Sequence, residues 1–265
     1  MKSILIVLSM AIIPLFASPV FSEEKDWLYE TKIPVTSQLP EARTAVLPQA
    51  LAQVLVKTSG DSKILSNSEI KLALKNANKW LQAFSYTSAD ENHRYQLVAH
   101  FSPKAVNHLL QEANIAFWGE NRPVVLAWVE YETPGQVAEI IHTDTPNSMA
   151  SLLKDNADRR GLPLILPMMD FTDMNQVGVN DIVTKSIPVL SQAAKRYASD
   201  AMLIVRIFKQ QKDYSATATL ILEKDQWDLT AAGKTPAKVI AALIDAVADD
   251  LAGRYAHNES TTPTE

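Results

Sequence analysis

Two segments of this chain have the pattern of β-strands with apolar residues on both faces, at 124–131 and 201–208. In the second segment, Met202 and Ile204 share one face, and Leu203 lies on the other. A strand of this kind is buried on both sides, as in the centre of a sheet that helices cover on each face. The two segments therefore predict an α/β fold built around an open sheet.

The strand and helix patterns divide the chain into two parts. Residues 23–116 follow the order strand, helix, helix, strand, strand, helix, which predicts an α+β amino-terminal domain. Residues 117–256 alternate strands with helices and predict an open α/β sandwich domain with a mixed sheet. A chain of 265 residues has room for two domains of this size.

Four local patterns give more detailed expectations. Pro48 removes one backbone hydrogen bond, so the first helix is expected to begin near it or to kink there. Ser66 and Glu69 have the spacing of a capping box for the second helix. Residues 162–169 are expected to form a strand. A helix capped by Asn180 or Ser186, bent or restarted at Pro188, is expected to run to Tyr197.

The first 22 residues have the layout of a cleavable secretory signal peptide, with Lys2 followed by an apolar stretch at 4–16 and small residues at 20–22. The apolar stretch is shorter than the roughly 20 residues that cross a membrane, although an uncleaved anchor remains the alternative. The sequence thus predicts export to the periplasm with no membrane span after cleavage. Residues 257–265 are polar and are expected to form a disordered tail.

Composition excludes several functional classes. The chain has no Cys, so it has no disulfides, no thiol catalysis and no lipid attachment through a Cys. With 25 basic against 30 acidic residues, it lacks the positive charge that nucleic acid binding requires. The seven glycines are scattered, which argues against phosphate-binding loops, and the common hydrolase motifs are absent. We therefore predict no catalytic residues, no cofactor and no metal, and whether the chain is an enzyme stays open.

Asp170 and Asp173 form the first candidate site, because they follow the expected strand at 162–169. Ligands of open α/β sheets bind beyond the carboxyl ends of the strands. Together with Glu130 and Glu132, at the end of an earlier strand, these carboxylates could bind a cation or a cationic ligand, or carry out acid–base chemistry. The alternative is that they are solvated loop residues that cap helices.

Arg206, Ile204 and Phe208 form the second candidate, a surface for a protein partner or a ligand. They share one face of the strand at 201–208, and the neighbouring strand at 214–223 is apolar on its other face. Helices are therefore expected to cover only that other face. The face with Arg206 needs a covering of its own, which could be a second helix layer, the amino-terminal domain or a partner protein.

The run at 118–123 is Trp118-Gly119-Glu120-Asn121-Arg122-Pro123, and an apolar strand follows it. This hexapeptide resembles the signature of a bacterial domain-of-unknown-function family, number two-thousand-sixty-six, and the resemblance extends over residues 28–131. It implies an exported protein of Gram-negative bacteria and supplies no activity. We interpret Trp118 and Arg122 as an aromatic plug and an arginine at the junction of the two domains, with a ligand site as the alternative.

These observations favour a soluble periplasmic module of the cell envelope that binds or assembles with an envelope protein. Its second domain is similar in expected fold to small periplasmic α/β domains of envelope accessory proteins, an analogy that does not fix function. An enzyme of unrecognised type that uses loop carboxylates is the first alternative. A carrier of a small ligand or of cell-wall material is the second.

Overall fold

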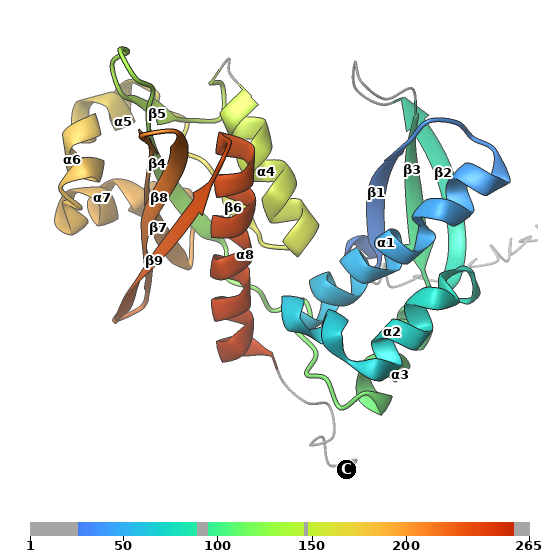
Figure 1. Cartoon of the computed structure of the whole chain (residues 1–265). Helices are drawn as coiled ribbons and strands as arrows, with labels where there is room; N and C mark the ends of the chain where they lie inside the picture. Colours follow the sequence, from blue (N-terminus) through green and yellow to red (C-terminus); the bar gives the residue numbers. More distant parts are fainter. Residues whose placement is uncertain (1–25, 89–94, 146–147, 257–265) are drawn as a thin grey trace, which may run out of the picture.

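The computed structural model describes residues 26–88, 95–145 and 148–256, and its elements form two lobes (Figure 1). We call residues 26–116 the N lobe and residues 125–256 the C lobe, with the linker at 117–124 between them. The division expected at residues 116 and 117 falls at the start of this linker. The predicted signal peptide at 1–22 and the predicted tail at 257–265 lie outside the described residues.

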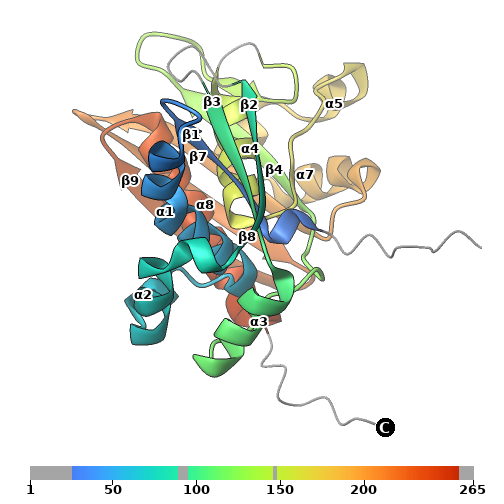
Figure 2. The same ribbon diagram turned by 90° about the vertical axis from the view of Figure 1, so that its right-hand side faces the viewer.

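The N lobe is a three-stranded antiparallel sheet in the order β1-β3-β2, packed against α1, with α2 and α3 at one end of the sheet (Figure 2). Its core lies between the sheet and the helices and includes Ile33, Leu51, Val54, Leu97 and Phe101. The elements are β1 (Glu30–Val35), α1 (Pro40–Ser59), α2 (Ser68–Lys75), β2 (Leu81–Ser88), β3 (Tyr95–Phe101) and α3 (Pro103–Glu112).

Two details of this lobe differ from expectation. Helix α1 begins at Pro40, where a proline's missing N–H group costs no helix bond, and it continues through Pro48. The apolar face of α1 buries Leu47 and Leu51 on either side of Pro48, and this packing offsets the lost hydrogen bond. The cap of α2 is Asn67 rather than Ser66: the Asn67 side chain accepts hydrogen bonds from the backbone N–H groups of Glu69 and Ile70.

The C lobe is built on a six-stranded mixed sheet in the order β5-β4-β7-β8-β9, with β6 beside β4. Strand β4 runs parallel to β6 and β7, and the other pairs are antiparallel. The elements are β4 (Val125–Glu132), β5 (Glu139–Ile141), α4 (Ser148–Arg160), β6 (Leu164–Ile165), α5 (Phe171–Gln176), α6 (Val179–Val183), α7 (Ile187–Ala194), β7 (Ala201–Gln210), β8 (Asp213–Leu222), β9 (Asp225–Gly233) and α8 (Pro236–Tyr255).

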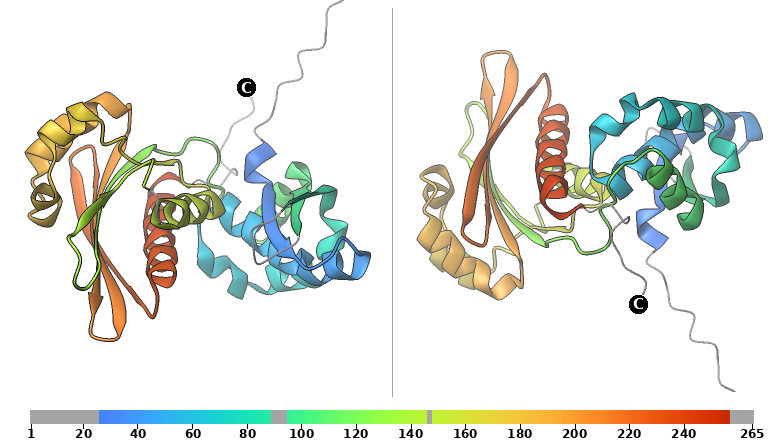
Figure 3. Two further views of the ribbon diagram at one scale, coloured as in Figure 1. Left: turned by 90° about the horizontal axis from the view of Figure 1, so that it is seen from above. Right: turned by 90° about the horizontal axis from the view of Figure 1, so that it is seen from below.

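Helices cover both faces of this sheet (Figure 3). Helices α4 and α8 lie between the sheet and the N lobe, and α5, α6 and α7 lie on the opposite face. The predicted α/β fold with a mixed sheet is confirmed. No helix in the described part of the chain is long and apolar enough to span a bilayer.

The segment between α4 and β7 differs most from expectation. The strand expected at 162–169 is only the two residues of β6, because Pro163 and Pro167 flank it and proline cannot donate to a strand ladder. The restart expected at Pro188 is found: α7 begins at Ile187, directly after Ser186, and a short 3₁₀ turn continues it to Tyr197. The helix before it, α6, is separate and starts after Gly178 rather than at Asn180. Helix α5 and the edge strands β5 and β9 were not predicted.

Candidate functional sites

The carboxylates of Asp170 and Asp173 are both bound by Arg196. Arg196 Nη2 lies 2.6 Å from Asp170 Oδ2, and its Nη1 lies 2.9 Å from Asp173 Oδ1. Asp170 also caps α5, accepting hydrogen bonds from the backbone N–H groups of Thr172 and Asp173. Asp173 is fully buried and accepts further hydrogen bonds from the Tyr197 hydroxyl and the backbone N–H of Met169.

These contacts shift the pKa values of Asp170 and Tyr197. The Arg196 guanidinium holds the pKa of Asp170 well below its usual range, and the helix-capping bonds act in the same direction. Burial, followed by the hydrogen bond to Asp173, raises the pKa of Tyr197 to about 12. Asp170 therefore matches the helix-capping alternative, whereas Asp173 is buried rather than solvated. Both carboxylates anchor α5 to Arg196, and Asp173 also binds Tyr197.

Glu130 and Glu132, expected to join this cluster, pair with a different arginine. Arg206 Nε lies 3.2 Å from Glu130 Oε2, and Arg206 Nη2 lies 3.8 Å from Glu132 Oε2. Burial raises the pKa of Glu130, while the hydrogen bond from Arg206 opposes that shift. No group of three or more metal-ligating side chains occurs among the described residues, so the structure does not assemble the cation site considered for these carboxylates.

Ile204 cannot be part of the surface predicted for Arg206, Ile204 and Phe208. It is only 1% exposed, because α6 and α7 cover the first half of this face of β7 with Ile182 and Leu190. Arg206 and Phe208 lie further along the strand and are half-buried, with the Arg206 guanidinium 5.8 Å from the centre of the Phe208 ring. A second helix layer is therefore the main covering of this face.

The structure places Trp118 and Arg122 between the two lobes. Trp118 is buried, and the Arg122 guanidinium stacks on its ring at 4.1 Å. Arg122 donates hydrogen bonds to five backbone carbonyls from three parts of the chain: α1, the linker and the end of α4. The acceptors are the carbonyls of Lys57, Trp118, Gly119, Arg160 and Gly161.

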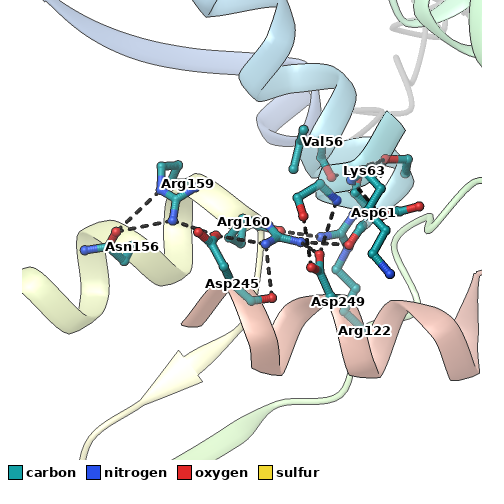
Figure 4. Close-up of polar contacts among 12 residues, drawn as sticks. Val56, Asp61, Lys63, Arg122, Asn156, Arg159, Arg160, Asp245 and Asp249 are labelled. Atoms are coloured by element: carbon teal, nitrogen blue, oxygen red, sulfur yellow. Dashed lines mark hydrogen bonds and ion pairs between the residues drawn. The ribbon is translucent and has the colours of Figure 1, made fainter. Parts of the chain in front are cut away.

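Arg160, at the end of α4, is a second arginine at the lobe boundary, and the sequence did not single it out. Its side chain is fully buried, and it donates to Asp245 Oδ1 at 2.8 Å and to Asp249 Oδ1 at 2.6 Å, both on α8 (Figure 4). It also donates to the carbonyl of Gly60 in the N lobe at 2.7 Å. We call Arg122, Arg160, Asp245, Asp249 and Gly60 the latch.

Three large apolar side chains are exposed at α5, another feature absent from the sequence prediction. Met168, Phe171 and Met174 are 48%, 77% and 61% exposed. Phe171 and Met174 are three positions apart on the helix and so share a face, with Met168 just before it. The sequence did not indicate this group, because residues 162–169 were expected to form a strand and α5 was not predicted. We call Met168, Phe171 and Met174 the α5 surface.

Comparisons with known proteins give a partial match. Residues 23–119 match the model of a family described as a domain of unknown function, DUF8605. The match covers the N lobe and ends inside the hexapeptide; it supports an uncharacterised family, under a number other than the one predicted. No curated protein matches the chain.

Among solved structures, a formyltetrahydrofolate deformylase from Pseudomonas putida KT2440 is similar over 72% of this chain and 89% of that chain. The identity is 13% and the TM-score is 0.17, which is too low to support an argument about fold or function.

Proposed function

We propose that this chain is an exported binding module of the bacterial cell envelope, and that it docks a partner protein through the α5 surface. The observation that carries the proposal is the exposure of Met168, Phe171 and Met174 within seven residues of one another. Single exposed apolar residues are common on protein surfaces, but a contiguous group is typical of an interaction site. The signal-like sequence at 1–22 supports export.

The α5 surface is held in place by the polar contacts beneath it. Arg196 binds the carboxylates at the start of α5, and the Tyr197 hydroxyl accepts a hydrogen bond from the backbone N–H of Met168. An apolar surface held in this way loses little conformational freedom when a partner binds. Phe and Met are also enriched in the buried centres of protein interfaces. Asp170 and Asp173 thus support a binding surface from below.

The alternative of an enzyme that uses Asp170 and Asp173 gains no support from this geometry. A general acid at neutral pH needs a carboxyl group whose pKa is raised toward 7. The pKa of Asp170 is instead lowered, and Asp173 accepts hydrogen bonds from three separate donors.

Crosslinking in the native envelope, followed by mass spectrometry, tests the proposal. The double variant Phe171→Asp, Met174→Asp should lose a crosslinked partner that the parent captures. A matched control is Leu39→Asp, Leu72→Asp, which changes two apolar residues of the N lobe, each 63% exposed. Capture of the same partner by the α5 variant at the parent level, with the control unchanged, would show that this surface is not the docking site.

A further inference from the structure

A cleft with a volume of about 800 Å³ lies between the lobes, where β1 and α1 face α4. Pockets of this size accommodate small molecules and short chains. The cleft is distinct from the α5 surface, which lies on the opposite side of the six-stranded sheet from α4 (Figure 3). Its lining includes Trp27, Gln53, Lys57, Gln96, Asp155 and Asp158.

Lys57 supplies a buried positive charge at this cleft. The residue is 7% exposed, and its ammonium donates hydrogen bonds to the carbonyls of Glu30 at 2.9 Å and Trp27 at 3.2 Å. A lysine ammonium has three donors, so one is left for another acceptor. Among the described residues Lys57 forms no ion pair. Burial and the charge of Arg122 lower its pKa to about 8, while the charges of Asp158 and Glu30 act in the opposite direction. A carboxylate in the cleft would supply a counter-charge in direct contact with the ammonium.

Asp155 and Asp158 supply negative charge on the opposite wall. They are three positions apart on α4, so their carboxylates lie on the same side of the helix. Burial, and then the charge of Asp158, raises the pKa of Asp155. Within the described part of the chain, neither carboxylate pairs with a cation, whereas the neighbouring Arg159 is paired with Asp245. An ammonium group in the cleft would relieve this repulsion.

The rest of the lining has uncharged polar groups and three charged side chains that already have partners: Lys32 lies 3.9 Å from Glu30, and Arg159 pairs with Asp245. The Thr31 hydroxyl donates to Gln53 Oε1, which leaves the Gln53 amide N–H groups as donors, and Gln96 adds a second amide. Such side chains match the alternating donors and acceptors of peptide bonds. Trp27, at 37% exposure, supplies an apolar ring at the same cleft.

We propose that the cleft binds a short peptide with free ends, its carboxylate at Lys57 and its ammonium at Asp155 and Asp158. The opposite charges on facing walls select a ligand that carries both charges, and the amide side chains select peptide bonds between them. A single amino acid carries the same charges but offers no internal peptide bond to Gln53 and Gln96.

Isothermal titration calorimetry of the exported chain with trialanine tests this proposal. Trialanine should bind saturably, and its N-acetylated and C-amidated forms should each bind about tenfold more weakly, the factor expected for the loss of one charged contact. Free alanine should bind more weakly than trialanine.

Two variants connect each end of the peptide to its wall. Asp155→Asn, Asp158→Asn should weaken trialanine binding about tenfold while leaving the N-acetylated peptide unchanged. Lys57→Gln should weaken trialanine and leave the C-amidated peptide unchanged. The aspartate positions are exposed, so that variant keeps the fold even if Lys57→Gln does not. A Phe171→Asp, Met174→Asp control should bind trialanine like the parent, which separates this proposal from the docking surface.

Two results would overturn the proposal: no saturable heat with trialanine up to about 10 mM, which corresponds to negligible affinity, or equal binding of the free and end-blocked peptides by the parent chain.

Discussion

The latch and the cleft lie along the same lobe boundary and use the same two helices, α1 and α4, but they treat charge in opposite ways. In the latch, the buried Arg160 is bound to two aspartates, and Arg122 is bound to five carbonyls. In the cleft, Lys57 has only two carbonyl partners, and Asp155 and Asp158 have no cation among the described residues. The aspartates hold Arg160 in place within the C lobe, and Arg160 and Arg122 bind the N lobe through the carbonyls of Gly60 and Lys57. The unpaired charges next to them are available for a ligand.

The largest expected effect comes from breaking the latch at its buried charge. Arg160→Met should cost about 3–5 kcal/mol of unfolding free energy, because it removes the shared cation of Asp245 and Asp249 and the bond to Gly60. Urea unfolding followed by circular dichroism measures this. The control Arg159→Met, whose side chain is 32% exposed, should cost less than about 1 kcal/mol. Equal costs for the two variants would show that the latch is not the stabilising part of the boundary.

A smaller effect is expected when the close approach of the lobes is blocked. Gly60 has a φ of 76°, and a Cβ atom there would lie 2.2 Å from the Cβ of Ala252 in α8. Gly60→Ala should therefore cost about 2–4 kcal/mol, from backbone strain plus overpacking. Gly135 has a similar φ of 79° with nothing within 4 Å, so Gly135→Ala isolates the backbone part, about 1 kcal/mol. Thermal unfolding should order the two variants accordingly, and a similar loss in both would argue against close packing at Gly60.

The buried charge of Lys57 predicts a pH dependence. Its folded pKa of about 8 lies below the ordinary 10.5, so between these values the unfolded chain binds the proton and the folded chain does not. Stability should therefore rise with pH, by about 2 kcal/mol from pH 8 to pH 10 for this one group. Lys57→Met should lack that part of the rise in urea unfolding at the two pH values. Parallel pH profiles of parent and variant would show that the ammonium is solvated.

The smallest effect is expected at the acidic wall of the cleft. Asp155→Asn, Asp158→Asn should change the unfolding free energy by less than about 0.5 kcal/mol, because neither carboxylate supports the fold. Asp249→Asn should instead cost about 1–3 kcal/mol, because it weakens the support of a buried arginine. A large loss in the first variant would mean that these carboxylates are structural.

How far the sequence predicts this molecule depends on the range of the interactions involved. The two apolar faces of β7 predict a central strand that is buried on both sides, although the sequence left open what covers the face with Arg206. The order of elements in the N lobe follows from local periodicity and capping. Strand β9 was missed although Trp227, Leu229 and Ala231 alternate with more exposed residues, which is the pattern of an edge strand with one face on the core.

The site residues were harder to predict, because their roles depend on distant partners. Arg160 lies 85 positions from Asp245, so nothing near it in the sequence indicates that it is buried. Ile204 was assigned to a surface because the positions of α6 and α7 over β7 cannot be deduced from β7 alone. The cleft brings together residues of β1, α1 and α4, and only the folded chain shows them as neighbours.

The latch also determines the order in which the two lobes can fold and dock. Ser62 donates a hydrogen bond to Asp249 across 187 positions of the chain, and Arg160 donates to the same aspartate. Contacts that close such long loops form late in folding. During synthesis the N lobe emerges long before α8, so it must persist with Trp118 and Gly60 undocked. The final helix thus completes the assembly, and a chain truncated before it would expose an apolar surface that invites aggregation.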